Sequence, residues 1–272
     1  MKRFFGFILN RLKVLFKLGS KPDFLILGAQ KAGTTSLFYT INSSSNNFCS
    51  PRNKELYFFS ENYYRGIEYY TAQFPIFRKK KSISGEATPD YLFYHRAPER
   101  IKMFNPDMKF VIVLRDPIER AFSQYNHQNF TRKTIANDPM SFSNSIRKEE
   151  SRYDIQGKSE YFYEYKYFSY KKRGLYEEQI ERWFEYFPRE QFFFIDISEL
   201  NNNGVMTNLF NFLGLDDSKL KRNISRVYNK NETDKFTIKN EDVNYLNDFY
   251  KGRFSNLEKL TGRTFSWTSK YE

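Results

Sequence analysis

The sequence predicts a single α/β domain in which helices flank a central parallel sheet. Short apolar runs that resemble strands alternate with stretches of helical spacing. One such run, KFVIVL at residues 109–114, has consecutive Val and Ile residues, as expected of a strand buried on both faces. A glycine-rich turn joins the first strand to the first helix, which is typical of sheets that bind phosphates at their strand ends.

The elements follow one another along the chain. We expect strands at residues 23–27, 82–86, 109–114 and 191–195. We expect helices at residues 34–41, 97–104, 117–125, 175–187, 205–213 and 243–260. Pro117 suits a first helical turn, and Pro188 and Gly214 are typical of the positions where helices end. The polar segment 131–158 shows no clear core face, and no stretch resembles a linker, so one domain covers residues 21–272.

Composition narrows the kinds of partner. The chain has 272 residues with 44 basic against 32 acidic side chains, a formal charge of +12, which favours a polyanion: nucleic acid, anionic lipid, a nucleotide or an acidic polysaccharide. Cys49 is the only cysteine, so an intramolecular disulfide is impossible and a reducing compartment such as the cytoplasm is the simplest location. With only two histidines, a Cys/His zinc site is not expected.

Residues 1–20, MKRFFGFILNRLKVLFKLGS, form a basic amphipathic segment. Arg11, Lys13 and Lys17 interrupt its apolar residues, so no run approaches the ~20 residues of a membrane span. It also lacks the small-residue cleavage site of a signal peptide. Two interpretations stay open: peripheral contact with a membrane surface, or packing of the apolar face on the domain.

The glycine-rich turn reads LGAQKAGTTSL at residues 27–37. Gly28 and Gly33 have the spacing of a P-loop, but Thr34 occupies the position where that motif has lysine. Lys31 lies inside the loop, and Thr34, Thr35 and Ser36 add hydroxyl donors at the helix start. The loop therefore favours a P-loop-type sheet that binds a 5′-phosphate group without a γ-phosphate. An ordinary strand-to-helix turn is the alternative for the loop taken alone.

A second motif, RDPIERAFSQY, follows the strand at residues 109–114. Arg115 lies at the carboxyl end of that strand, where open α/β sheets bind ligands, and Ser123 lies on the following helix. A guanidinium and a hydroxyl suit a second phosphate. Two phosphate pockets indicate a nucleotide phosphorylated at both its 5′ and 3′ positions.

With both motifs, the sequence resembles the sulfotransferases that use 3′-phosphoadenosine 5′-phosphosulfate (PAPS). GAQKAGTT is similar to their 5′-phosphosulfate loop and RDPIERAFSQY to their 3′-phosphate motif. KELYFFS, GEATPDYL, GLYEEQIERWFEYFP and LTGRTFSW are similar to segments of the heparan-sulfate-type enzymes, in the same order, so the resemblance covers residues 23–267.

The resemblance implies roles for individual residues. Glu55 matches the general base that deprotonates the acceptor, and Lys31 matches the lysine that stabilises the leaving phosphate. The remaining cofactor-binding matches are Ala32, Gly33, Thr34, Thr35, Ser36, Arg115 and Ser123. Tyr91 would line the acceptor crevice. PAPS is then the co-substrate, no metal takes part, and in-line transfer goes to a hydroxyl or amine of a carbohydrate.

The chain also departs from the heparan-sulfate 3-O-sulfotransferases. Ala87 replaces a lysine, Tyr57 replaces a histidine two residues after the base, and a Lys-Gly-Arg phosphate loop is missing. Lys230, Lys235 and Lys239, in NKNETDKFTIKN, are candidate substitutes. Two of these differences lie on the acceptor side, so the acceptor stays open between a sugar, a polysaccharide, a lipid and a small natural product. Nucleic acid is not expected as a partner.

Two other functions compete with this interpretation. A P-loop small-molecule kinase would require lysine at position 34 and an acidic Mg²⁺ ligand, whereas Asp116 is better explained by its turn. A non-enzymatic polyanion-binding module would explain the charge but not the ordered motifs. For His95 and His127 we expect structural or surface roles. The aromatic run at residues 161–170 has two interpretations: it could stack on sugar or adenine rings, or, as we favour, form a helix with one packed side.

Overall fold

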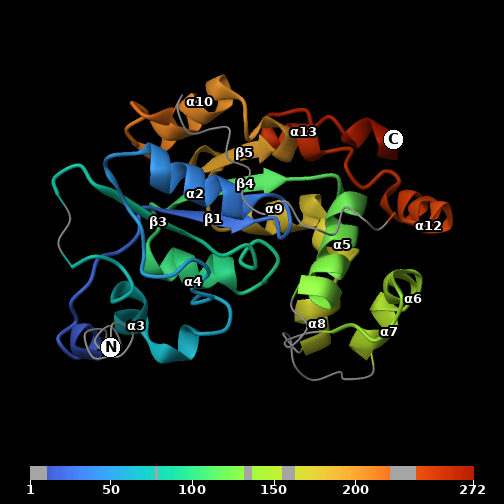
Figure 1. Ribbon diagram of the computed structural model, residues 1–272, viewed down its shortest axis with the longest axis horizontal. Coiled ribbons are helices and arrows are strands. Elements are labelled where there is room, and N and C mark those ends of the chain that lie inside the picture. The colour runs from blue at the N-terminus through green and yellow to red at the C-terminus, as the bar shows by residue number, and fades with distance from the viewer. Residues whose placement is uncertain (1–10, 77–78, 132–136, 155–162, 221–236) are drawn as a thin grey trace.

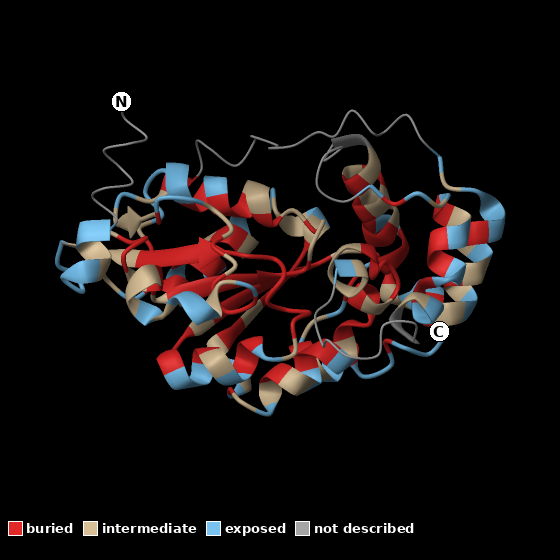
Figure 2. Ribbon diagram, turned by 90° about the horizontal axis from the view of Figure 1, so that it is seen from below, coloured by how far each residue is buried: buried red, intermediate tan, exposed pale blue. Residues whose placement is uncertain are grey.

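A computed structural model of the chain describes residues 11–76, 79–131, 137–154, 163–220 and 237–272. Its centre is a five-stranded sheet in the order β2-β3-β1-β4-β5, and every neighbouring pair is parallel. The strands are β1 (Phe24–Gly28), β2 (Phe48–Cys49), β3 (Ile83–Ala87), β4 (Lys109–Leu114) and β5 (Phe192–Asp196). Helices lie on both sides of the buried strands (Figure 2), so the predicted α/β fold with a helix-flanked parallel sheet is confirmed.

Each of the six regions expected to be helical contains a helix, and further short helices that were not expected lie between them (Figure 1). The helices are α2 (Thr34–Ser44), α3 (Ile67–Thr71), α4 (Ala97–Phe104), α5 (Pro117–Asn126), α6 (Phe142–Arg147), α7 (Glu149–Asp154), α8 (Tyr163–Phe168), α9 (Tyr176–Phe184), α10 (Asn203–Leu213), α12 (Asn240–Tyr250) and α13 (Leu257–Thr261). Short turns of other helix types are η1 (Tyr63–Arg65), η2 (His127–Thr131), η3 (Lys172–Gly174), η4 (Arg189–Gln191), η5 (Ile197–Glu199) and η7 (Thr268–Tyr271). No helix in the described parts of the chain combines the length and the apolar character needed to cross a bilayer.

Two expectations about helices are wrong. The helix expected at residues 243–260 is two helices, because Gly252 adopts a left-handed conformation (φ 69°) after α12 and donates its N–H to the Tyr271 carbonyl. The segment 131–158 was expected to lack a core face. In its described part, however, Phe142 and Ile146 of α6 are buried in the hydrophobic core. Their spacing of four residues places both side chains on one side of the helix.

The order of the strands determines which edge of the sheet is expected to bind a ligand. Strand β1 lies between β3 and β4, so the carboxyl ends of these three strands are neighbours. The chain leaves β1 at Gly28, β3 at Ala87 and β4 at Leu114. Three segments that are far apart in sequence therefore meet at one edge, where parallel α/β sheets bind their ligands.

Candidate functional site

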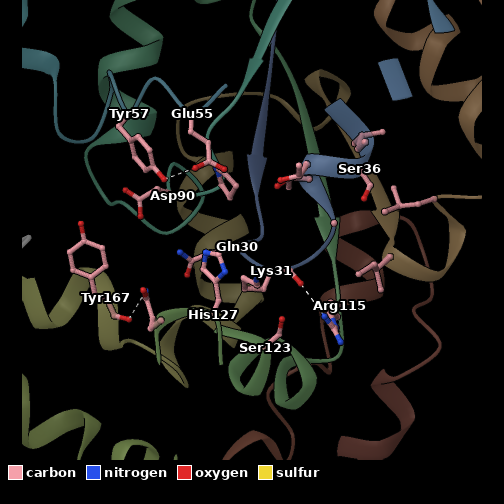
Figure 3. A pocket seen from close by; sticks show the side chains of 18 of the residues that line it. Gln30, Lys31, Ser36, Glu55, Tyr57, Asp90, Arg115, Ser123, His127 and Tyr167 are labelled. Carbon is pink, nitrogen blue, oxygen red and sulfur yellow. Dashed lines mark hydrogen bonds between the residues drawn. The ribbon is translucent and has the colours of Figure 1, made fainter. Parts of the chain in front are cut away.

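A cavity of about 780 Å³ opens at the carboxyl edge of β3, β1 and β4. All the predicted site residues except Ala32 line it, namely Lys31, Gly33, Thr34, Thr35, Ser36, Glu55, Arg115 and Ser123. In the view of Figure 3, Glu55 lies on one side of Lys31, and Arg115 and Ser123 lie on the other. The fold thus brings the three separate sequence motifs to one cavity.

The loop after β1 has a backbone suited to an anion. Lys31 (φ 68°) and Gly33 (φ 87°) both have a left-handed backbone, a conformation that occurs in loops whose N–H groups bind anions. Gly33 immediately precedes α2, whose first N–H groups have no partner within the helix. A side chain at Gly33 would also collide with Leu200, because an added Cβ would lie 2.7 Å from its Cδ1. The left-handed backbone therefore favours glycine here, and any larger residue would also have to displace the tip of the Leu200 side chain.

Ala32 takes a different position from its neighbours in the loop. Its side chain is fully buried, and its N–H donates to the carbonyl of Ala29 at 3.1 Å. The residue closes the loop from within and does not line the cavity. Thr34, Thr35 and Ser36 at the start of α2 do line it.

Arg115 connects the end of β4 to the loop after β1. One guanidinium nitrogen donates to the carbonyl of Lys31 at 3.3 Å, while two others donate to Glu119 at 3.1 and 3.2 Å. Its own carbonyl accepts a hydrogen bond from the hydroxyl of Tyr176 at 2.7 Å. Ser123 lies two turns along α5 and faces the same cavity. The guanidinium and the hydroxyl are thus held beside the loop.

Asp116 has a structural role that matches the sequence interpretation. Its carboxylate caps α5 by accepting the N–H groups of Ile118 and Glu119. It also accepts hydrogen bonds from Lys270 at 2.9 Å and from the hydroxyl of Tyr271 at 3.0 Å. The carboxylate that a kinase would need for Mg²⁺ is therefore engaged with the C-terminal segment.

Glu55 projects into the cavity from an irregular segment beside β3. Its carboxylate forms an ion pair with Lys54 and accepts a hydrogen bond from the hydroxyl of Tyr57 at 2.8 Å. Glu55 (φ 63°) and Tyr57 (φ 50°) both have left-handed backbones, which costs energy for residues with a Cβ. The N–H of Glu55 donates to the carbonyl of Ala87, the last residue of β3. Tyr57 thus contacts the carboxylate directly.

A buried carboxylate lies behind this segment. Glu86 of β3 is fully buried and accepts hydrogen bonds from the hydroxyls of Tyr70 (2.9 Å), Tyr91 (3.0 Å) and Thr88 (2.8 Å). It also accepts the N–H of Leu56 at 3.4 Å. Burial raises the pKa of Glu86, and these hydrogen bonds act in the opposite direction.

The Glu86 cluster, defined as Glu86 with Tyr70, Thr88 and Tyr91, holds three consecutive amides of the Glu55 segment. Leu56 N–H donates to Glu86, Tyr57 N–H to the Thr88 hydroxyl at 3.4 Å, and Phe58 N–H to the Tyr91 hydroxyl at 2.8 Å. The expectation that Tyr91 lines the acceptor crevice is wrong, because its side chain is fully buried and its hydroxyl is used in this cluster.

We expect Glu86→Gln to loosen the Glu55 segment. Gln keeps only one oxygen acceptor, so either the Leu56 N–H and the Thr88 hydroxyl or the two tyrosine hydroxyls lose their acceptor, which costs about 1–3 kcal/mol locally. Amide hydrogen exchange of residues 56–58 should accelerate roughly tenfold or more.

The Glu86→Gln variant should also lose part of the pH dependence of the free energy of unfolding. Folding raises the pKa of Glu86. The contribution of Glu86 to the free energy of unfolding is therefore full below the pKa of glutamate in the unfolded chain, and it falls as the pH rises above that pKa.

Asp138→Asn is a matched control. Asp138 is also a buried carboxylate, but its partners are Ser145, Arg152 and Tyr170. It should destabilise the protein without a selective effect on exchange at residues 56–58. Unchanged exchange there in Glu86→Gln would show that the cluster does not hold the segment.

The wall opposite the loop was only partly anticipated. Lys166 of α8 forms an ion pair with Glu61 at 2.6 Å and donates to the hydroxyl of Tyr167 at 2.8 Å. Burial alone would lower the pKa of Lys166, but these two partners raise it. Asp90, which follows β3, pairs with the buried Arg173 at 2.8 Å. These ion pairs place positively and negatively charged side chains, Lys166 with Glu61 and Asp90, along this wall of the cavity.

Some cavity residues were missed or misassigned. His127, for which a structural or surface role was expected, lines the cavity. It lies four residues after Ser123, at the start of η2, so helical spacing continued past α5 could have placed both side chains on one side. Lys166 and Tyr167 come from the aromatic run at residues 161–170, and the lining residues without any such signal include Gln30, Glu61, Asp90 and Gln128. The candidate phosphate ligands Lys230 and Lys235 lie outside the described residues, and Lys239 is an exposed residue before α12.

Fold and site together define a class: an α/β protein with a phosphate-binding loop after its first strand, an Arg–Ser pair beside that loop, and a carboxylate facing both. The sequence model of the sulfotransferase domain family matches residues 21–256. The chain belongs to this family, so the resemblance seen in the sequence is confirmed.

Two of the similar proteins have names that refer to heparan sulfate. The chain is 28% identical over 278 residues to heparan sulfate glucosamine 3-O-sulfotransferase 3B1 of Mus musculus, covering 92% of this chain and 66% of that protein. It is 31% identical over 217 residues to the bifunctional heparan sulfate N-deacetylase/N-sulfotransferase of Drosophila melanogaster, covering 71% and 20% respectively. The chain thus spans just under two thirds of the first relative and a fifth of the second.

Solved structures agree with the fold. A sulfotransferase from Alicyclobacillus acidocaldarius superposes with a TM-score of 0.71 at 29% identity, covering 92% of this chain and 99% of that one. Mouse sulfotransferase SULT7A1 complexed with PAP superposes with a TM-score of 0.51 at 13% identity, covering 94% and 96%. At that identity the second comparison supports the fold alone.

Proposed function

We propose that the enzyme transfers a sulfuryl group from PAPS to a hydroxyl or amine of a carbohydrate. The observation that carries the proposal is that Glu55 faces the same cavity as the phosphate loop and the Arg115–Ser123 pair. A phosphate site alone would suit many nucleotide-binding proteins, whereas a carboxylate beside it supplies a base for transfer. The names of the heparan sulfate relatives favour a sugar acceptor.

The donor side fits a nucleotide with two separate phosphates. The first turn of α2, with Thr34, Thr35 and Ser36, would hold the 5′-phosphate, because amides and hydroxyls converge there with the positive end of the helix dipole. Arg115 and Ser123 would hold the 3′-phosphate. When bound, PAPS supplies the sulfuryl group and the phosphate that leaves.

The acceptor side provides the base. Glu55 would take the proton of the acceptor hydroxyl as the acceptor oxygen bonds to sulfur. The bond between sulfur and the phosphate oxygen breaks in the same displacement, and Lys31 with the amides of α2 would stabilise the negative charge left on that oxygen. The hydrogen bond from Tyr57 and the ion pair with Lys54 would orient the carboxylate of Glu55.

We expect adenosine 3′,5′-bisphosphate, the product nucleotide, to stabilise the protein without Mg²⁺. At about 100 times its dissociation constant the gain is about 2.7 kcal/mol, or a rise in Tm of roughly 5–10 °C for a chain of this size. AMP, which lacks the 3′-phosphate, should give a smaller shift. Differential scanning fluorimetry measures both. A response to Mg·ATP alone would contradict the proposal and favour a kinase.

A further inference from the structure

Exposed apolar side chains gather at one place on the protein. Within the described residues, nine large hydrophobic side chains are exposed, and six of them lie on two short segments. Four are on residues 11–18 and two are on residues 64–67; they are Leu12, Leu15, Phe16, Leu18, Tyr64 and Ile67. Leu15 is 72% exposed, Phe16 63% and Tyr64 84%. We name these two segments together the N-terminal face.

The first segment is held against α3, which begins at Ile67 of the second segment, and against the residues that follow α3. Lys13 donates to the carbonyls of Ala72 and Phe74, each at 2.5 Å, and Lys17 pairs with Glu68 of α3 at 3.7 Å. Gly19 packs so closely on the end of α3 that an added Cβ would meet the carbonyl oxygen of Thr71. Figure 1 accordingly places the N-terminal segment beside α3. The apolar residues are therefore presented on an anchored segment rather than on a free tail.

The charge of the N-terminal face selects the kind of partner. Arg11, Lys17 and Arg65 are exposed among the apolar side chains, and Glu68 is the one acidic residue of α3. Residues 1–10, MKRFFGFILN, continue the same mixture of cations and large apolar residues in sequence. Apolar side chains bordered by Lys and Arg fit a lipid surface with negative headgroups, where the apolar groups enter the boundary and the cations meet phosphates.

We propose that the N-terminal face binds the surface of an anionic bilayer and holds the enzyme there without crossing it. This inference does not depend on the proposed reaction, because neither segment contributes a residue to the cavity. It assigns a partner to side chains that the catalytic site leaves unexplained.

The test uses the full chain and vesicle sedimentation. The protein should sediment with phosphatidylglycerol vesicles and remain in solution with phosphatidylcholine vesicles. The double variant Leu15→Ser/Phe16→Ser should bind phosphatidylglycerol at least about tenfold more weakly. Arg11→Gln and Lys17→Gln should each weaken binding about fivefold, an effect that added salt should reproduce.

Tyr39→Ser is the matched control, because Tyr39 is 40% exposed on α2 and lies outside the N-terminal face. It should bind like the unaltered chain, and both serine variants should keep their response to adenosine 3′,5′-bisphosphate. Absence of vesicle binding, equal binding to both lipids, or binding that survives the double substitution would overturn the proposal. So would a dimer without lipid that the double substitution dissociates, since the N-terminal face would then join two copies.

Discussion

A protein in which Glu55 is replaced by Gln should keep its affinity for the nucleotide and lose its turnover. Gln has nearly the same shape but cannot accept the acceptor's proton, and one positioned base is typically worth about 10²–10⁴ in rate. The acceptor for the assay comes from a panel of sugars, glycolipids and small alcohols screened with labelled donor. We expect kcat to fall by that factor, while the dissociation constant of adenosine 3′,5′-bisphosphate changes less than about threefold.

Glu61→Gln provides the control for this experiment. Glu61 also lines the cavity and also pairs with a lysine, Lys166, at 2.6 Å, but it lies outside the segment that matches the base. Its loss should alter KM more than kcat. If Glu55→Gln weakened nucleotide binding and turnover equally, Glu55 would be a structural residue that supports its strained segment through Tyr57 and Lys54.

Lys31→Ala should give the second-largest loss, and it should fall on kcat. The lysine lies in the loop beside the position proposed for the departing phosphate, and removing one such charge-stabilising donor typically costs about 10²–10³ in kcat. The left-handed backbone at residue 31 does not confuse the result, because Ala and Lys both carry a Cβ and share that conformational cost. Single-turnover kinetics with saturating donor measure the chemical step directly.

Arg115→Ala is the contrasting variant. It should weaken binding of adenosine 3′,5′-bisphosphate by about 10–100-fold, the range for hydrogen bonds to a charged group, and leave AMP binding almost unchanged. Lys102→Ala, a change on the exposed side of α4, should leave the affinity for both nucleotides unchanged. Equal losses for both nucleotides in Arg115→Ala would place Arg115 at the 5′-phosphate or in the loop's own support, through its bond to the Lys31 carbonyl.

Local sequence signals worked well for the sheet. The four expected strands begin and end within one residue of β1, β3, β4 and β5. They are recognisable because consecutive apolar residues in parallel strands are a strong pattern, bounded here by glycine and proline. Strand β2 was missed since it has only two residues, Phe48 and Cys49, too few to show a period.

The phosphate loop and the Arg115 motif could also be predicted from the sequence, because the residues of each are close neighbours in the chain. A left-handed glycine, a helix start and a strand end occupy neighbouring positions in the chain. Their chemistry could therefore be inferred before their position in space was known. Glu55 was found only through resemblance, since an isolated carboxylate beside Lys54 has no local signature of a base.

By itself, the sequence determined a parallel α/β sheet with a phosphate loop after its first strand and an arginine after a neighbouring one. Only the tertiary structure decided which side chains face the cavity. It buried Tyr91 against Glu86, and it brought Lys166 and Glu61 together from positions about a hundred residues apart. The physical reason is that the strand and helix patterns depend on near neighbours in the chain. The direction of a side chain, and the partner that fixes it, depend on how separate elements pack.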